Sequence, residues 1–157
     1  MRTLDTIETA LTAAETGHLV FTTLHTNSAP STIDRIVAVF PAEQQQQIRL
    51  QLSMTLRGVL AQQLLPKKDG SGRVAACEVM IPNDAIRSLI RDAKTPQIVN
   101  ALATSAAEGN ITMDNSLLRL VRENVIAPET ALAAAQDTAY MKRALTAPGV
   151  QTRMVMR

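Results

Sequence analysis

The fold class is decided by residues 18–25, which read HLVFTTLH. This stretch is short, apolar at its start and rich in β-branched and aromatic side chains, which is typical of a buried strand in a mostly parallel sheet. Residues 4–16 before it carry apolar side chains at three- and four-residue spacing, and Gly17 follows as a helix stop. Residues 31–40 after it also have a helical pattern. A strand between two helices predicts the α/β class.

A long helix and a β-hairpin are predicted next. Apolar residues recur on one face over residues 42–62, directly after Pro41. Residues 64–73, LLPKKDGSGR, hold the strongest turn signal of the chain, so a β-hairpin is expected over residues 61–81. Beyond Pro82 the pattern predicts only short helices and a frayed tail, and these fall at residues 85–92, 97–108, 113–124, 129 onward and, for the tail, 149–157.

This pattern divides the chain into an α/β part, residues 1–82, and an all-helical part, residues 83–157. The 157 residues, of which 46% are hydrophobic and 19% charged, are enough to bury a core. With two Phe, one Tyr and no Trp, that core is expected to be aliphatic. The composition excludes fibrous and disordered classes.

Charge and cysteine usage exclude further functions. A net charge of +2 leaves no basic footprint for nucleic acid. Cys77 is the one cysteine, which excludes an internal disulfide and a multi-cysteine metal site within one chain. A reducing, cytoplasmic setting is therefore predicted. No apolar run reaches the length of a transmembrane segment, so none is expected.

The candidate chemistry lies at the end of the predicted strand, where residues 24–28 read LHTNS. In open α/β sheets, ligands bind beyond the carboxyl ends of the strands. His25 and Thr26 are therefore candidates to contact a phosphate or to hold an attacking water. The alternative is that these polar residues only close a strand and cap the next helix. His18, seven residues earlier, would lie roughly 23 Å away on an extended strand and point to the opposite face, which favours a structural role for it.

No known catalytic template completes this site. The sequence contains no GxxxxGK[ST] phosphate-binding loop, and the glycines of residues 70–72 fall in the predicted hairpin turn. It also lacks an HExxH pair, a GxSxG elbow and an EF-hand loop. We therefore expect no metal site.

Residues 9–26, TALTAAETGHLVFTTLHT, resemble the His box region of hexameric secretion and pilus ATPases. The likeness continues through residues 31–36 and 39–43, STIDRI and VFPAE, and is strongest to the type IV pilus retraction ATPases of the PilT family. The resemblance implies the C-terminal part of a RecA-like P-loop ATPase core, with a mostly parallel sheet and a β-hairpin, followed by a small helical lobe.

Two features favour the retraction subfamily. Assembly and type II secretion ATPases usually carry a four-cysteine zinc module where this chain has a short hairpin, and Cys77 alone cannot supply it. Residues 85–92, AIRSLIRD, resemble the AIRNLIRE motif of retraction motors, with departures at Ser88 and Asp92.

That octapeptide has the pattern of an amphipathic helix, with an apolar side and an arginine side. An ordinary surface helix with solvated arginines would show the same pattern. Because the resembling motif is needed for retraction in the family, we expect a contact or coupling surface formed by Ala85, Ile86, Arg87, Leu89, Ile90 and Arg91.

In the family, the phosphate-binding loop and the Walker B strand precede the His box. Met1-Arg2 resembles the end of the family's Gly-Glu-Met-Arg-Asp segment, with Thr3 in place of Asp, so the catalytic glutamate is expected just before Met1. The resemblance thus implies a C-terminal fragment of a homo-hexameric motor that retracts pili. His25 would sense the γ-phosphate of ATP, with Thr26 supporting it.

The same resemblance implies ATP and Mg²⁺ as cofactors of the intact motor and none for the fragment, which is expected to be inactive alone. It implies pilus-base partners and a cytoplasmic location at the inner-membrane face. Two other classes stay open, a non-catalytic interaction module of this family and a fragment of a type II secretion or pilus-assembly ATPase. A self-sufficient phosphotransfer enzyme is least supported.

Overall fold

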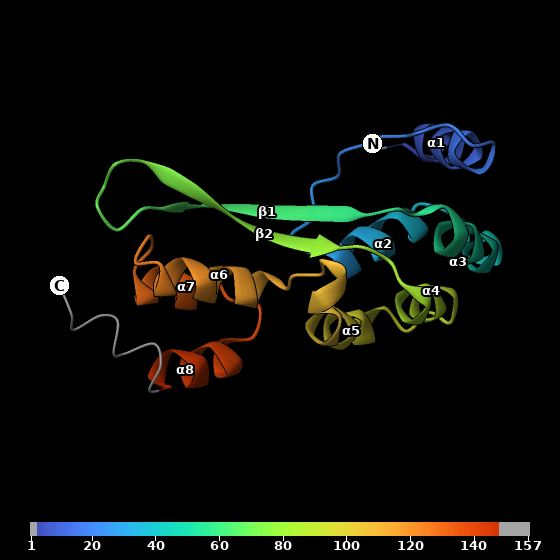
Figure 1. Cartoon of the computed structure of the whole chain (residues 1–157). Coiled ribbons are helices and arrows are strands. Elements are labelled where there is room, and N and C mark those ends of the chain that lie inside the picture. Colours follow the sequence, from blue (N-terminus) through green and yellow to red (C-terminus); the bar gives the residue numbers. More distant parts are fainter. Residues whose placement is uncertain (1–2, 148–157) are drawn as a thin grey trace. The chain divides into compact units, whose positions relative to one another are not determined.

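The computed structural model describes residues 3–147 (Figure 1). By their contacts, these residues group into two compact units. Within these residues, the first unit comprises residues 3–61 and 79–110, and the second comprises residues 62–78 and 111–147. This grouping by contacts differs from the division after residue 82, which was predicted from the order of strands and helices. Both hairpin strands run from one unit into the other, and the helix that follows Pro82 packs with helices from the first half of the chain.

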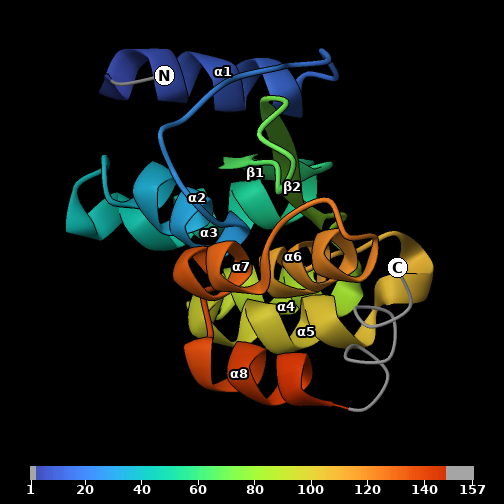
Figure 2. The same cartoon turned by 90° about the vertical axis from the view of Figure 1, so that its left-hand side faces the viewer.

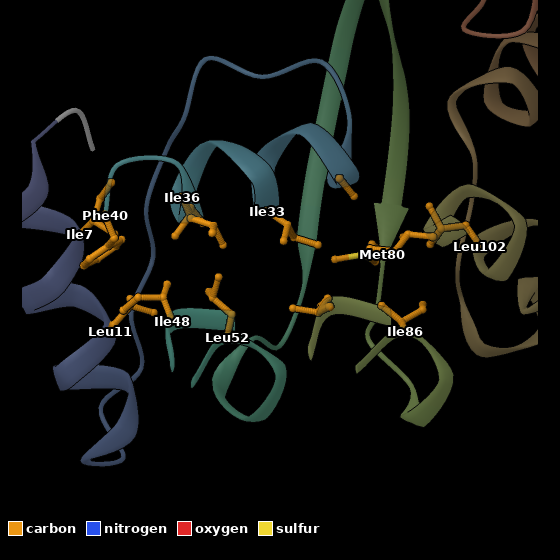
Figure 3. Packing of buried hydrophobic residues seen from close by; sticks show 14 residues of the cluster. Ile7, Leu11, Ile33, Ile36, Phe40, Ile48, Leu52, Met80, Ile86 and Leu102 are labelled. Atoms are coloured by element: carbon orange, nitrogen blue, oxygen red, sulfur yellow. The ribbon is translucent and has the colours of Figure 1, made fainter. Parts of the chain in front are cut away.

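The first unit is a set of helices around one aliphatic core. The helices are α1 (Leu4–Glu15), α2 (Ala29–Val37), α3 (Ala42–Thr55), α4 (Asp84–Arg91) and α5 (Ile98–Thr104), with short 3-10 turns η1 (Thr95–Gln97) and η2 (Ala106–Glu108). Helix α3 contacts α1, α2 and α4. The core side chains of these helices and of the end of the second hairpin strand point toward one another, among them Ile7, Leu11, Ile33, Ile48, Leu52, Met80, Ile86 and Leu102 (Figure 3).

The predicted strand over residues 18–25 is wrong in this structure. These residues have no regular secondary structure, and the side chains of Leu19 and Phe21 are 77% and 87% exposed. Among the described residues, the sheet consists of the two hairpin strands alone. An apolar, β-branched run shows that a segment suits a buried sheet, but a strand forms only against a neighbouring strand that accepts its backbone hydrogen bonds.

The predicted hairpin is confirmed as β1 (Val59–Pro66) and β2 (Arg73–Met80). Its turn is closed by the amide of Lys67, which donates to the carbonyl of Gly72 at 2.9 Å. The amide of Ser71 donates to Oδ1 of Asp69 at 2.9 Å, and this hydrogen bond lowers the pKa of the Asp69 carboxyl.

The predicted helix over residues 42–62 is too long. Helix α3 ends at Thr55, and Leu56 already has an extended backbone with φ −62° and ψ 126°. The apolar residues beyond it, beginning at Val59, belong to β1. A continuous apolar run fits a helix and a buried strand equally well, so the boundary between them is not set by periodicity.

The second unit packs three helices, α6 (Met113–Arg122), α7 (Pro128–Ala134) and α8 (Thr138–Thr146), which Figure 2 shows from the side. Asp114 is 7% exposed and accepts hydrogen bonds from the amides of Gln136 and Asp137 at 2.8 and 2.9 Å. These bonds fix the turn between α7 and α8. The unit's core includes Leu65, Ala76, Met113, Leu117, Val121, Ile126, Ala131 and Met141.

The helices predicted after Pro82 are confirmed, with the one from residue 129 onward divided into α7 and α8 and the one over 97–108 shortened to α5 with η2. The predicted frayed tail, residues 149–157, lies outside the described residues, as do Met1 and Arg2. Within residues 3–147, no helix combines the length and the apolar character needed to span a bilayer.

Replacing Ile33, which is fully buried in the first unit, by Ala should lower the free energy of unfolding by about 2–5 kcal/mol, because the deleted methyl groups leave a cavity. Urea unfolding followed by circular dichroism measures this change. Leu50→Ala, at a side chain 43% exposed on α3, is the matched control and should stay within about 0.5 kcal/mol. Equal losses for the two variants would contradict the assignment of the core.

Candidate functional site

His25 lies in the irregular segment that leads into α2, and its side chain is exposed. The next residue, Thr26, shares a 2.7 Å hydrogen bond between its hydroxyl and that of Thr32 on α2. The Thr32 hydroxyl also donates to the carbonyl of Ser28 at 2.8 Å. Thr26 therefore ties the segment to the first turns of α2 and limits where His25 can point.

The start of α2 is fixed by a reciprocal cap. The hydroxyl of Ser28 accepts from the amide of Ser31 at 3.2 Å, while the Ser31 hydroxyl lies 3.2 Å from the amide of Ser28. Pro30 sits in the first turn, where no backbone donor is needed. The capping role that the sequence left open thus belongs to Ser28, and it leaves the imidazole of His25 at the surface.

His18 lies at the end of α1. Its Nδ1 is 3.1 Å from the hydroxyl of Thr16 and 3.3 Å from the carbonyl of Ala13, and its amide donates to the same carbonyl at 3.0 Å. These are contacts of a helix C-terminus, where carbonyl groups lack partners within the helix. They support a structural role for His18.

The AIRSLIRD segment forms α4, which Asn83 caps through a 3.0 Å hydrogen bond from the amide of Ile86 to its Oδ1. Ile86 and Ile90 are fully buried, and Leu89 packs partly against the same core. The apolar side predicted from the sequence is therefore the side that anchors α4 to the first unit.

Arg87 does not behave as a solvated arginine. Its Nη1 donates to the carbonyl of Ser53 at 2.6 Å and lies 3.5 Å from the carbonyl of Met54, at the C-terminus of α3. A guanidinium at this position satisfies carbonyl groups that α3 leaves unpaired and complements the negative end of the helix. The sequence pattern could not show this contact, because its two partners are 34 and 33 residues apart in the chain.

Arg91 is the more exposed arginine of the motif. Its Nη2 donates to the hydroxyl of Ser88 at 3.3 Å, and its Nε lies 3.7 Å from Oδ1 of Asp92. Its backbone carbonyl accepts from Nε2 of Gln46 on α3 at 3.0 Å, which adds a second tie between the two helices. An open hollow at this side of α3 and α4 is lined by Ser53, Met54, Arg57, Asp84, Arg87 and Arg91.

The first unit also contains a polar cluster that the sequence does not predict. The hydroxyl of Thr95, which is 3% exposed, lies 2.8 and 3.0 Å from the two carboxylate oxygens of Asp34, and Nη2 of Arg49 is 3.5 Å from Oδ1. These three residues join α2, α3 and η1, so the cluster holds the unit together. Neither Thr95 nor Arg49 belongs to a local motif that could have revealed it.

The site as a whole offers binding and positioning groups. Within residues 3–147, no group of three His, Cys, Asp or Glu side chains lies where it could hold a metal ion. The imidazole of His25 is a donor of the kind that phosphate oxygens accept, whereas the hydroxyl hydrogen of Thr26 is used in the bond to Thr32. The arginine hollow of α3 and α4 is suited to anionic groups.

Comparison with known proteins defines the class to which this fold and site belong. The chain belongs to the family described as type II/IV secretion system protein, whose family model matches residues 1–143. Among solved structures, that of the pilus retraction motor PilT with bound ADP matches 91% of this chain and 40% of its own, with 50% identity and a TM-score of 0.80. The ATPase DotB of Legionella pneumophila matches 86% of this chain with 27% identity and a TM-score of 0.72.

Two curated relatives show which members of the family this chain is similar to. A twitching motility protein of Neisseria gonorrhoeae is 53% identical over 90% of this chain, and the type IV pilus retraction ATPase PilT of Pseudomonas aeruginosa is 53% identical over 83%. The chain spans 38% of the length of each of them. The chain is thus a homologue of the pilus retraction ATPases, and its fold is that of part of their ATPase region.

We expect alanine substitutions of the two arginines of α4 to change the free energy of unfolding by different amounts. Arg87→Ala should lower the free energy of unfolding by about 1.5–3 kcal/mol, because it removes a charged hydrogen bond to the end of α3. Arg91→Ala, whose lost contacts are at the surface, should stay within about 0.5 kcal/mol. Urea unfolding of both variants tests this difference, and a larger loss for Arg91→Ala would contradict the assignment.

Proposed function

We propose that this chain works as the C-terminal part of a homo-hexameric, ATP-hydrolysing motor that retracts type IV pili. The observation that carries the proposal is the 53% identity over 90% of the chain to a twitching motility protein, together with the likeness to a retraction motor that binds ADP. In this proposal the motor lies in the cytoplasm, against the inner-membrane machinery at the base of the pilus.

His25 is the residue that we assign to the γ-phosphate. Its exposure and its position just before the capped start of α2 support this role, because a helix N-terminus favours nearby negative charge. Thr26 supports it by holding the segment to α2 through Thr32. ATP is bound with Mg²⁺ in this proposal, and no residue of this chain is assigned to the metal.

Helix α4 is the coupling element of the proposal. Its apolar side is fixed in the core by Ile86 and Ile90, so a force applied to its outer side is passed to α3 and the rest of the unit. Arg87 strengthens this link through the carbonyl of Ser53. The outer side, with Ala85 and Arg91, is the surface left for partners.

Replacing His25 by Ala in the full-length motor should slow ATP turnover about ten- to a hundred-fold. The reason is the loss of one hydrogen bond to a charged phosphate, worth about 1.5–3 kcal/mol. His18→Ala is the matched control, and it should leave turnover within about two-fold because its contacts are confined to the end of α1. Unchanged turnover in His25→Ala would remove this residue from the site.

The 157-residue chain by itself should bind ATP no tighter than millimolar and should not hydrolyse it. The reason is that its sequence contains no GxxxxGK[ST] loop, so the backbone donors that cradle phosphates are missing from it. Isothermal titration calorimetry with ATP and Mg²⁺ measures the affinity. Micromolar binding would contradict the proposal and favour an independent nucleotide site.

A further inference from the structure

Two surfaces of opposite charge lie on the first unit, on helices that both contact α3. One is the arginine hollow defined above, whose lining includes three arginines and one aspartate. The other is an acidic face of α1, lined by Asp5, Glu8, Thr9, Thr12, Ala13 and Thr16.

Acidic residues predominate in the sequence of α1 and the segment after it. Between Arg2 and Arg35 the sequence contains four acidic residues and no Lys or Arg. Asp5 and Glu8, one helical turn apart, are exposed, whereas Ile7 and Leu11 point into the core. Glu15 is engaged otherwise, because its Oε2 accepts from Nε2 of Gln51 on α3 at 3.2 Å. Asp5 and Glu8 are therefore the carboxylates presented to the outside.

The arginine hollow keeps an unneutralised charge. Arg87 is committed to the end of α3, and Arg91 is partly balanced by Asp92 at 3.7 Å. Arg57 is exposed and makes no hydrogen bond or ion pair with any residue that the structure describes. Met54, 57% exposed, adds an apolar contact area beside these cations. Arg87 and Arg91 lie where a positive charge stabilises the negative C-terminal end of a helix. That role does not account for Arg57.

We propose that the acidic face of α1, through Asp5 and Glu8, docks into the arginine hollow of a second copy of this chain, where Arg57 and Arg91 receive it. Helices α1 and α4 both pack against α3. Each copy of the chain therefore carries both the acidic face and the arginine hollow, on different helices of the same unit. A contact between two different surfaces of identical chains is head-to-tail, and its repetition closes rings when the rotation permits. The proposal rests on the proposed function only in that it supplies one contact of the proposed motor ring.

Exposed ion pairs contribute little affinity each and mainly set orientation and association rate, so we expect this contact to be weak and sensitive to salt. The exposed apolar run at Leu19 and Phe21 could also drive association, but that association would strengthen with salt. The direction of the salt dependence therefore separates the two.

The test is sedimentation equilibrium of the 157-residue chain at about 50 mM and at about 500 mM NaCl. At the higher concentration the Debye length is only a few Å, so interactions between exposed charges are largely screened. D5R/E8R and R57E/R91E should each weaken self-association at low salt at least ten-fold. An equimolar mixture of the two variants should recover association in alternating order, because the intact surfaces of the two variants complement each other and so do their reversed surfaces. The quadruple variant D5R/E8R/R57E/R91E should associate as the unchanged chain does.

Two controls match these variants in charge. K142E/R143E on α8 and E123R/E129R in the second unit change the same number of charges at exposed positions, and both should leave association unchanged. Circular dichroism and thermal unfolding show whether each variant is folded. The proposal is overturned if the unchanged chain stays monomeric, if association strengthens with salt, or if the quadruple variant does not recover association. The self-association measured here does not depend on whether His25→Ala slows ATP turnover. The docking proposal and the proposed function can therefore be contradicted independently.

Discussion

The packing of α4 against α3 is the interaction on which the first unit depends. Ile86 and Ile90 are fully buried, and Arg87 closes the C-terminus of α3 through the carbonyl of Ser53. The link joins a helix after the hairpin to one before it, so it organises chain segments that are far apart in sequence. It also explains why α4, whose sequence has the pattern of a surface helix, has one side buried in the core and the other side exposed.

The arrangement separates two tasks within one unit. The segment before α2 presents His25 at the surface, and it is held by Thr26, Thr32 and the Ser28 cap. Helix α4 presents a different surface, the arginine hollow. Because α2 and α4 both contact η1 and pack on the same core, a displacement at one is resisted by the other. Such a unit suits a protein that must convert a change at a nucleotide into movement, which is the proposed function.

Local signals in the sequence predicted much of the fold. The hairpin follows from the glycine-rich turn of residues 67–72, and α4 follows from its amphipathic spacing. The strand over residues 18–25 was not formed, because a strand depends on neighbours that no local pattern supplies. The sequence pattern predicted the arginine side of α4, but it could not predict that Arg87 contacts the carbonyl of Ser53, which is 34 residues away in the chain. The Asp34–Thr95 contact was missed for the same reason.

The central claim of the proposed function is that His25 contacts the γ-phosphate of ATP in the proposed motor. An electron cryomicroscopy structure of the full-length protein with a non-hydrolysable ATP analogue tests it most directly. The account predicts a ring nitrogen of His25 about 3 Å from a γ-phosphate oxygen. A structure in which another residue contacts the γ-phosphate and His25 lies beyond hydrogen-bond reach would contradict it.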